Sequence, residues 1–519
     1  MQRESLGDIG RPLSRLTLEG ISIGVLLRFV SRAFAGVVSY VILVRFVEPD
    51  GVAVILALSS FLLIALQASN LGFDEAYVRV GTELYGRGNI ASLRDLTMLY
   101  MKLSMLRLAV GTAFLAILDY LSGWIIPLDI LVVGFIIIIL RVIVKINSLI
   151  IRVFMNISLS QMIDNAVFFA AFAGTIIGAM LGSILAIVCL WATFYGAYAV
   201  VTLILSRRYT RKFTLAKANC NLGKLKNEFM EISYPLFIIS VLLTLNSRID
   251  SLFIAALEPI VTLEIIAVYL LVSRIALSIA DTLRPVATTM LSSLSYAKTR
   301  DTKVFSRSLG VTLRLTLLVF FTILIAIIPI SHIIIYVLFG EAYAIGSALL
   351  PIFMIIGILT VLSSLMKMIS IVVGRIKLYA FILFTALAVR VSLYSSLFVL
   401  RIVDGLEISM LLAYFTLASQ ILLFIMIAIW FRDIFAESME DLAKIVFIVI
   451  PFIAISEYLL AIRFMSGYAL TLLMPATYLI LTLRVGCLRE IDLIVAQKAL
   501  PKRLRWIIKI VKRIALIKN

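Results

Sequence analysis

Cysteine and histidine, which supply most metal ligands and many nucleophiles, are nearly absent from this chain of 519 residues. It contains three cysteines and one histidine, and the cysteines lack the spacing of a zinc site. With so few of these residues, the sequence offers no Ser/His/Asp or Cys/His catalytic group. No polar segment contains a Gly-rich phosphate loop or a DxD pair. The sequence predicts a protein without a metal site, a cofactor or enzymatic activity.

Charged residues are also scarce, at 15% of the chain, whereas 63% of the residues are hydrophobic and the mean hydropathy is +1.13. A bilayer core of about 30 Å is crossed by about 20 apolar residues in a helix. Runs of that length follow one another along nearly the whole sequence, which predicts an all-α polytopic membrane protein. The N-terminus lacks the features of a cleaved signal peptide, so we expect the first span to be retained.

Polar breaks divide the apolar sequence into fourteen candidate spans. They lie near residues 20–45, 51–78, 97–122, 127–152, 160–182, 184–206, 231–256, 263–291, 309–331, 345–370, 377–400, 408–431, 442–463 and 467–488. The break from Gly178 to Gly182, between the fifth and sixth spans, contains no charged residue and is the weakest boundary. Without that break the chain would have thirteen spans.

Basic and acidic residues alternate between the loops. The segments after even-numbered spans are basic, above all residues 207–226 and the C-terminal tail, whereas the opposite loops hold acids such as Glu48, Asp50 and Glu341. Because lysine and arginine concentrate in cytoplasmic loops, we place both termini in the cytoplasm. The net charge of +18 follows from this distribution and requires no nucleic-acid partner.

The longest polar break separates two blocks of six spans, with two further spans at the end. We expect an N-terminal six-helix lobe at 1–206, a basic cytoplasmic linker at 207–230, a C-terminal six-helix lobe at 231–432, two additional helices at 433–490 and a basic amphipathic tail at 491–519. Many transporters are built from two such halves around a central site.

The C-terminal tail is too charged to span a membrane. After Pro501 its apolar residues fall on one face of a helix, while lysines and arginines surround the rest. Such a segment is predicted to lie along the cytoplasmic surface and to bind anionic lipids. The alternative is a disordered basic tail that only contributes to the positive charge of the cytoplasmic side.

Charged residues inside the apolar runs are mostly basic. Arg28 and Arg32 share one face of the first span, Arg141 and Lys145 share a face of the fourth, and Arg274 lies in the eighth. A charge at the bilayer centre costs about 2.5–3.5 kcal/mol on insertion scales, so these side chains are expected to face water or a partner. Two bases one helical turn apart repel each other, which favours an anion or water between them.

Two other interpretations apply to these basic residues. Arg28 and Arg32 form structural ion pairs if an acid such as Asp164 or Asp250 lies beside them, although central bases outnumber central acids. A second group lies near predicted span ends, where long basic side chains extend to the membrane surface. This group consists of Arg45, Arg79, Arg107, Arg314 and Arg375.

Three stretches of the second half carry a family resemblance: "EFMEISYPLFIISVLLTLNSRIDSLFIAAL", "VYLLVSRIALSIADTLRPVATTMLSSLSYAKTRD" and "IIIYVLFGEAYAIGSALLPIF". The first-half stretch "EPDGVAVILALSSFLLIALQASNLGFDEAYVRV" adds to it. With Tyr234-Pro235-Leu236 entering span seven, Asp250 ending it, Tyr269 opening span eight and Phe339-Gly340-x-x-Tyr343 before span ten, the sequence resembles polysaccharide flippases. These belong to the multidrug/oligosaccharidyl-lipid/polysaccharide (MOP) exporter superfamily.

The resemblance implies two six-helix bundles in a pseudo-twofold arrangement around a central cavity. It also implies cavity arginines that hold the diphosphate of a polyprenyl-linked sugar, which by position are Arg28, Arg32 and Arg274. Arginine binds phosphate oxygens through two parallel hydrogen bonds and keeps its charge. Arg141 and Lys145 complete the set of candidate substrate-binding residues.

The expected function is therefore export of a lipid-linked oligosaccharide across the cell membrane by a monomer that alternates between inward and outward access. Asp164 and Asp250 are the candidates for coupling to a proton or a sodium ion. Three alternatives stay open: a multidrug exporter of the same superfamily, a polymerase or ligase of polysaccharide assembly, and a scaffold or lipid scramblase. A drug exporter would favour acidic lumen residues, and a polymerase or ligase would favour a sizeable outer loop.

Overall fold

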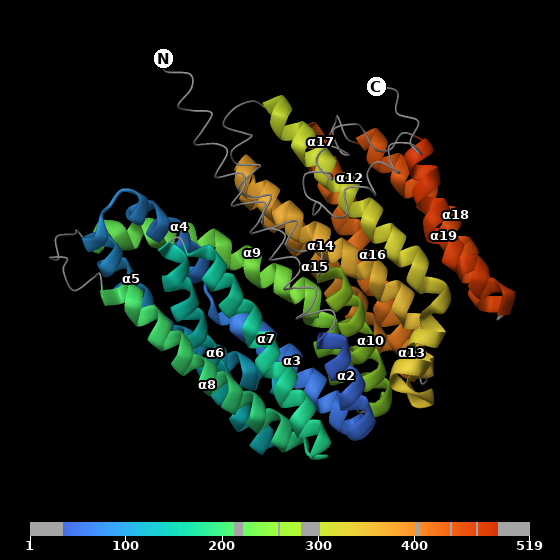
Figure 1. Cartoon of the computed structure of the whole chain (residues 1–519), viewed down its shortest axis with the longest axis horizontal. Coiled ribbons are helices and arrows are strands. Elements are labelled where there is room, and N and C mark those ends of the chain that lie inside the picture. Colours follow the sequence, from blue (N-terminus) through green and yellow to red (C-terminus); the bar gives the residue numbers. More distant parts are fainter. Residues whose placement is uncertain are drawn as a thin grey trace, which may run out of the picture. The chain divides into compact units, whose positions relative to one another are not determined.

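A computed structural model describes residues 35–154, 156–211, 222–257, 260–281, 302–400, 405–435, 439–462 and 465–485. Helices joined by short turns make up these segments, and no strand occurs among them (Figure 1). Ten of the helical segments are long and apolar enough to cross a membrane. The chain is thus an all-α, multi-pass membrane protein, as predicted. Arg28, Arg32 and the tail at 491–519 lie outside the described residues.

The helices fall into two compact units. The first contains α2 (Ala35–Phe46), α3 (Pro49–Ser69), α4 (Phe73–Gly86), α5 (Ile90–Leu121), α6 (Leu128–Val153), α7 (Ile157–Met180), α8 (Ile184–Thr210), α9 (Leu222–Ala256), most of α10 (Leu263–Asp281), α15 (Ile376–Leu400) and the first part of α16 (Gly405–Trp430). We call it the large unit. It holds every described residue of the candidate site.

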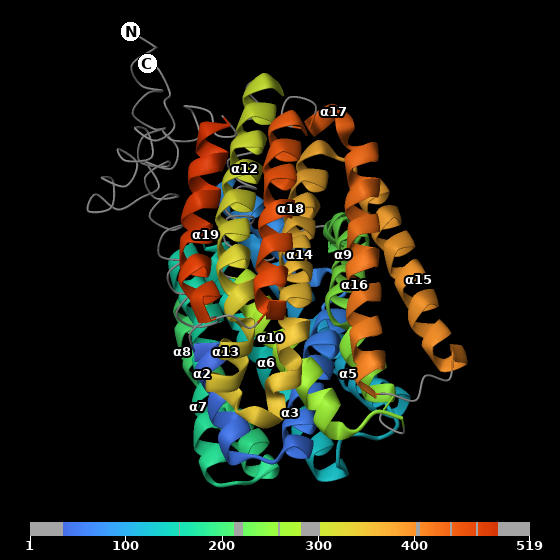
Figure 2. The same ribbon diagram turned by 90° about the vertical axis from the view of Figure 1, so that its right-hand side faces the viewer.

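The second unit contains α12 (Thr302–Ile327), η3 (Ile328–Ile330), α13 (Ser331–Phe339), η4 (Glu341–Ala348), α14 (Leu349–Val373), the last part of α16, α17 (Arg432–Phe435), α18 (Met439–Ile462) and α19 (Met465–Arg484). Within it α12, α18 and α19 pack side by side (Figure 2). A cluster of buried side chains, including Leu318, Val449 and Tyr478, joins these three helices.

Each of the fourteen expected spans overlaps a described helix, and the full count stays a prediction. The weakest expected boundary is a real one, because α7 ends at Met180 and α8 begins at Ile184. The Ser183 side chain caps α8 by accepting a hydrogen bond from the amide of Ala186. The two helices approach closely at Gly178, where an added Cβ would lie 2.5 Å from the Cα of Ile187.

The second expected span is not one helix, and here the prediction was wrong. Helix α3 ends at Ser69, and α4 begins at Phe73 after Leu71 and Gly72, which both have a positive φ. A Cβ on Gly72 would lie 2.1 Å from the carbonyl oxygen of Ser233 on α9. The absence of a side chain therefore lets the α3–α4 turn contact the backbone of α9.

Aromatic residues of α4 and α5 form part of a buried cluster in the large unit, together with Phe229 of α9. The rings of Tyr77 and Tyr100 stack with their centroids 4.4 Å apart. This cluster fixes the first part of α9 against α4 and α5. The domain boundaries expected from the sequence stay a prediction, although α8 and α9 both extend into the expected linker, to Thr210 and from Leu222.

Candidate functional site

Arg274 on α10 points at one turn of α3. Its Nη2 donates hydrogen bonds to the hydroxyl of Ser60, to the hydroxyl of Ser59 at 3.2 Å and to the carbonyl oxygen of Leu56 at 3.4 Å. Only 4% of the residue is exposed. A guanidinium group is thus buried between two membrane-spanning helices, and its hydrogen-bond acceptors among the described residues are neutral oxygen atoms.

Arg274 has no carboxylate within ion-pairing distance among the described residues, and its buried Nε–H has no acceptor there. Removing a charge from water is costly unless the group is paired and fully hydrogen-bonded. Among the described residues Arg274 lacks a negative charge in direct contact and an acceptor for its Nε–H, although Asp250 attracts it from a greater distance. An anion would supply both, which makes this residue the centre of the candidate site.

Helix α2 passes close to α10 in the same unit. A Cβ on Gly36 would lie 3.7 Å from the hydroxyl of Ser278, which is one turn from Arg274. In the sequence Arg32 precedes Gly36 by four residues, and Arg28 precedes it by eight. These two predicted site residues lie outside the described residues, so their place beside Arg274 stays a prediction.

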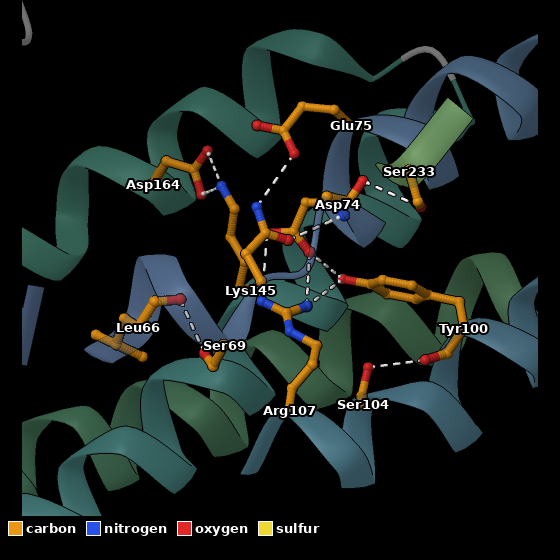
Figure 3. A network of polar contacts seen from close by, with 12 residues as sticks. Leu66, Ser69, Asp74, Glu75, Tyr100, Ser104, Arg107, Lys145, Asp164 and Ser233 are labelled. Carbon is orange, nitrogen blue, oxygen red and sulfur yellow. Dashed lines mark hydrogen bonds and ion pairs between the residues drawn. The ribbon is translucent and has the colours of Figure 1, made fainter. Parts of the chain in front are cut away.

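The basic stripe predicted on α6 has partners within the large unit. Lys145 forms an ion pair with Asp164 of α7, with Nζ 3.2 Å from Oδ2 (Figure 3). Ser148 donates to the same carboxylate at 3.0 Å. The guanidinium carbon of Arg141 lies 5.6 Å from the ring centroid of Tyr195. The structure therefore joins Lys145 and Asp164, for which the sequence predicted two different roles.

The other predicted coupling residue, Asp250, lies in a polar cluster formed by α9, α10, α15 and α16. Tyr269 donates to its carboxylate at 3.5 Å. Arg390, which is fully buried, donates from Nε to Ser419 at 2.6 Å and from Nη1 to the backbone oxygen of Asn246, one turn before Asp250. Arg390 lies inside the apolar run predicted at 377–400, and nothing in its spacing indicated these partners.

A second polar network, formed by α4 and α5, was missed by the sequence analysis. Arg107 and Asp74 form a buried ion pair with Nη1 2.6 Å from Oδ1, and Tyr100 donates to the same oxygen at 2.6 Å (Figure 3). Arg314 is likewise buried and forms an ion pair with Asp441 at 3.1 Å in the other unit. The prediction that Arg107 and Arg314 extend to the membrane surface was therefore wrong.

No known family model matches this chain, and no curated protein matches it. Several solved structures do match this chain. A lipid II flippase, MurJ, in an inward closed conformation matches with a TM-score of 0.61 over 87% of this chain and 98% of the flippase, at 14% identity. A multidrug resistance transporter of the MATE family in an inward-facing conformation matches with a TM-score of 0.54 over 79% of this chain and 98% of the transporter, at 11% identity.

A third structure is a MOP superfamily transporter from Pyrococcus furiosus, with a TM-score of 0.51 over 80% of this chain and 96% of that protein, at 12% identity. These likenesses extend over most of the described helices and agree with the resemblance found in the sequence. The chain has the fold of the transporters of the MOP superfamily.

Proposed function

We propose that this protein is a flippase that moves a polyprenyl (di)phosphate-linked oligosaccharide from the cytoplasmic to the outer leaflet. The observation that supports this most is Arg274, a buried guanidinium with neutral partners and an unused Nε–H. A diphosphate carries at least two negative charges through a region of low dielectric constant, and arginine provides a matching, permanently charged donor.

In this proposal the phosphates bind Arg274 together with Arg28 and Arg32. The sugars occupy the polar interior, and the lipid tail stays in the bilayer. Arg141 and Lys145 add positive charge on α6, of which Asp164 offsets one unit. Alternating access then requires two states of the protein that bind the headgroup from opposite sides.

Of the two coupling candidates, Asp250 suits a proton better than Asp164 does. Lys145 lies within 3.4 Å of both carboxylate oxygens of Asp164, so that carboxylate already has a counterion. Asp250 is 5% exposed, and a carboxylate that is buried as an ion is costly, so a proton that neutralises it removes this cost. We therefore propose Asp250 as the residue that binds a proton if transport is coupled to one.

Export of a small molecule is the second candidate function, because the fold matches MATE-family multidrug transporters as well as the flippase. The buried basic residues favour an anionic molecule over the cationic drugs for which acidic residues are suited. Both candidate functions place an anion at Arg274. In the first the anion is attached to a lipid, and in the second it is not.

Reconstitution of the purified protein in vesicles with a fluorescent polyprenyl-diphosphate sugar tests the proposal. We expect the wild type to bring the sugar within reach of an impermeant modifying enzyme, Arg274→Ala to abolish this, and Arg274→Lys to restore it in part because lysine lacks the fork. Arg207→Ala, which changes an exposed arginine in the last turn of α8, serves as the control. Equal transport by Arg274→Ala would contradict the phosphate role. Transport of soluble anions but not of the lipid-linked sugar would favour the second candidate.

A further inference from the structure

Two adjacent serines of α3 meet the arginine of the candidate site. Ser59 and Ser60 both place their hydroxyl oxygens at Nη2 of Arg274, and the carbonyl oxygen of Leu56 lies at the same nitrogen. All three acceptors come from one turn of a helix. Because one terminal nitrogen makes every contact with α3, the rest of the guanidinium group, including Nε–H, donates to none of the described residues.

The orientation of the two hydroxyl groups is also fixed. Each donates its own proton to the carbonyl oxygen of Leu56 at 2.9 Å. Serine in a helix commonly bonds back to the preceding turn in this way. With the protons committed to Leu56, the lone pairs of both hydroxyl oxygens are free to accept from Arg274. The turn therefore presents acceptors alone to the arginine.

These acceptors differ in one respect from those of Arg107 and Arg314, and resemble those of the buried Arg390, which also donates to a hydroxyl and a carbonyl oxygen. Asp74 and Asp441 orient Arg107 and Arg314 and also neutralise them. Ser59 and Ser60 orient Arg274 without adding a negative charge. A side chain that binds an anion needs a fixed orientation and a positive charge that no adjacent carboxylate neutralises. Neutral hydroxyl acceptors allow both.

We propose that Ser59 and Ser60 are positioning residues for an oxyanion of the phosphate class bound at Arg274. They hold Nη2 against α3, so that the remaining N–H groups are directed toward the anion before it arrives. This inference rests on the proposed role of Arg274 in substrate binding and assigns a role to α3 that the arginine alone does not imply. The competing explanation is that the serines are only small residues that allow α3 and α10 to pack closely.

Inorganic pyrophosphate is a suitable probe, measured by calorimetry on the full chain in lipid nanodiscs. Removing both hydroxyls in Ser59→Ala/Ser60→Ala should weaken pyrophosphate binding about tenfold, since hydrogen bonds to a charged group are lost. The single variant Ser60→Thr leaves Ser59 in place and keeps a hydroxyl at position 60. It should bind pyrophosphate with nearly wild-type affinity. Ser60→Asp should abolish binding, because a carboxylate would orient the arginine but neutralise it.

The matched control is Ser69→Ala. Ser69 lies on the same helix, is fully buried and bonds back to Leu66 at 2.8 Å, but it accepts no hydrogen bond from an arginine among the described residues. This variant should bind pyrophosphate as the wild type does. If the double alanine variant does not accumulate, the pyrophosphate affinities of the single variants Ser60→Ala and Ser60→Thr are compared instead.

The outcomes distinguish the role of the two serines from that of Arg274. Wild-type affinity in the double alanine variant, combined with loss of binding in Arg274→Ala, overturns the positioning role and leaves the phosphate role of Arg274 intact. Wild-type affinity in Arg274→Ala overturns both. Wild-type affinity in Ser60→Asp also contradicts the inference, because a purely steric role makes no distinction between a neutral and a charged oxygen beside the arginine.

Discussion

Buried guanidinium groups in this protein are held in two ways. Arg107 and Arg314, which are 3% and 2% exposed, each contact a buried carboxylate. Arg274, 4% exposed, contacts hydroxyl and carbonyl oxygens instead. The first arrangement stabilises the helix packing only while both partners are present. The second places no carboxylate in contact with the guanidinium, and Arg390, whose acceptors are Ser419 and the Asn246 carbonyl, shares it. The acceptor alone therefore does not separate a structural arginine from a candidate binding residue.

At the residue scale, Asp74→Ala should destabilise the protein by about 3–5 kcal/mol, because it leaves Arg107 buried without a counterion. Thermal unfolding in detergent measures this change. Replacing both partners, as in Asp74→Leu/Arg107→Leu, should recover much of the loss. Glu83→Ala is the control: it breaks the Glu83–Arg87 pair, whose side chains are 49% and 70% exposed, and should change stability by less than about 1 kcal/mol. Equal effects of Asp74→Ala and Glu83→Ala would contradict the structural role.

The sequence could identify these residues but not their partners. Each charge inside an apolar run stands out from its neighbours, and this was enough to find Arg274, Lys145 and Asp250. The pairing of Arg107 with Asp74 joins residues 33 positions apart, and that of Arg274 with Ser60 joins residues 214 apart. Helical spacing predicts which residues share a face, but only tertiary packing decides which two faces meet.

At the element scale, the turn between α3 and α4 depends on glycine. In Gly72→Ala the new Cβ would meet the α9 backbone at 2.1 Å, in addition to the strain of a φ of 72°. We expect destabilisation on the order of 3 kcal/mol or more, measured as a lower midpoint of thermal unfolding. Gly88→Ala measures the backbone strain without the steric contact, because φ is 71° there but nothing lies within 4 Å of the added Cβ. It should cost about 1–2 kcal/mol. Similar losses in the two variants would show that the contact with α9 is unimportant.

Element positions were largely predictable because apolar length is a strong signal in membrane proteins. Even the weak break near Gly182 was placed correctly, and in the structure the side chain of Ser183 caps the helix that follows it. The break at Leu71 and Gly72 was missed because apolar residues continue through it. A left-handed turn changes the direction of the chain without changing its hydropathy, and the α9 backbone that requires the glycine lies 161 residues away.

At the scale of the whole molecule, the alternation of loop charges predicts the orientation of the chain in the membrane. Single cysteines introduced as Asp50→Cys, Ile260→Cys and Glu341→Cys, in a background without the native cysteines, should react with an impermeant reagent from outside the cell. Lys217→Cys should react only after lysis, because it lies in the basic segment assigned to the cytoplasm. Labelling at position 217 in intact cells would contradict the fourteen-span topology.

The acceptors at Arg274 have an electrical consequence for the proposed transport. Because Ser59, Ser60 and Leu56 carry no formal charge, the guanidinium remains a fixed positive charge of the protein, and a bound anion carries its own charge when it leaves. With the cytoplasm negative, each elementary negative charge moved outward gains about 2.3 kcal/mol per 100 mV. In the proposed function, outward movement of a diphosphate headgroup would be electrogenic, and the membrane voltage would favour export over return.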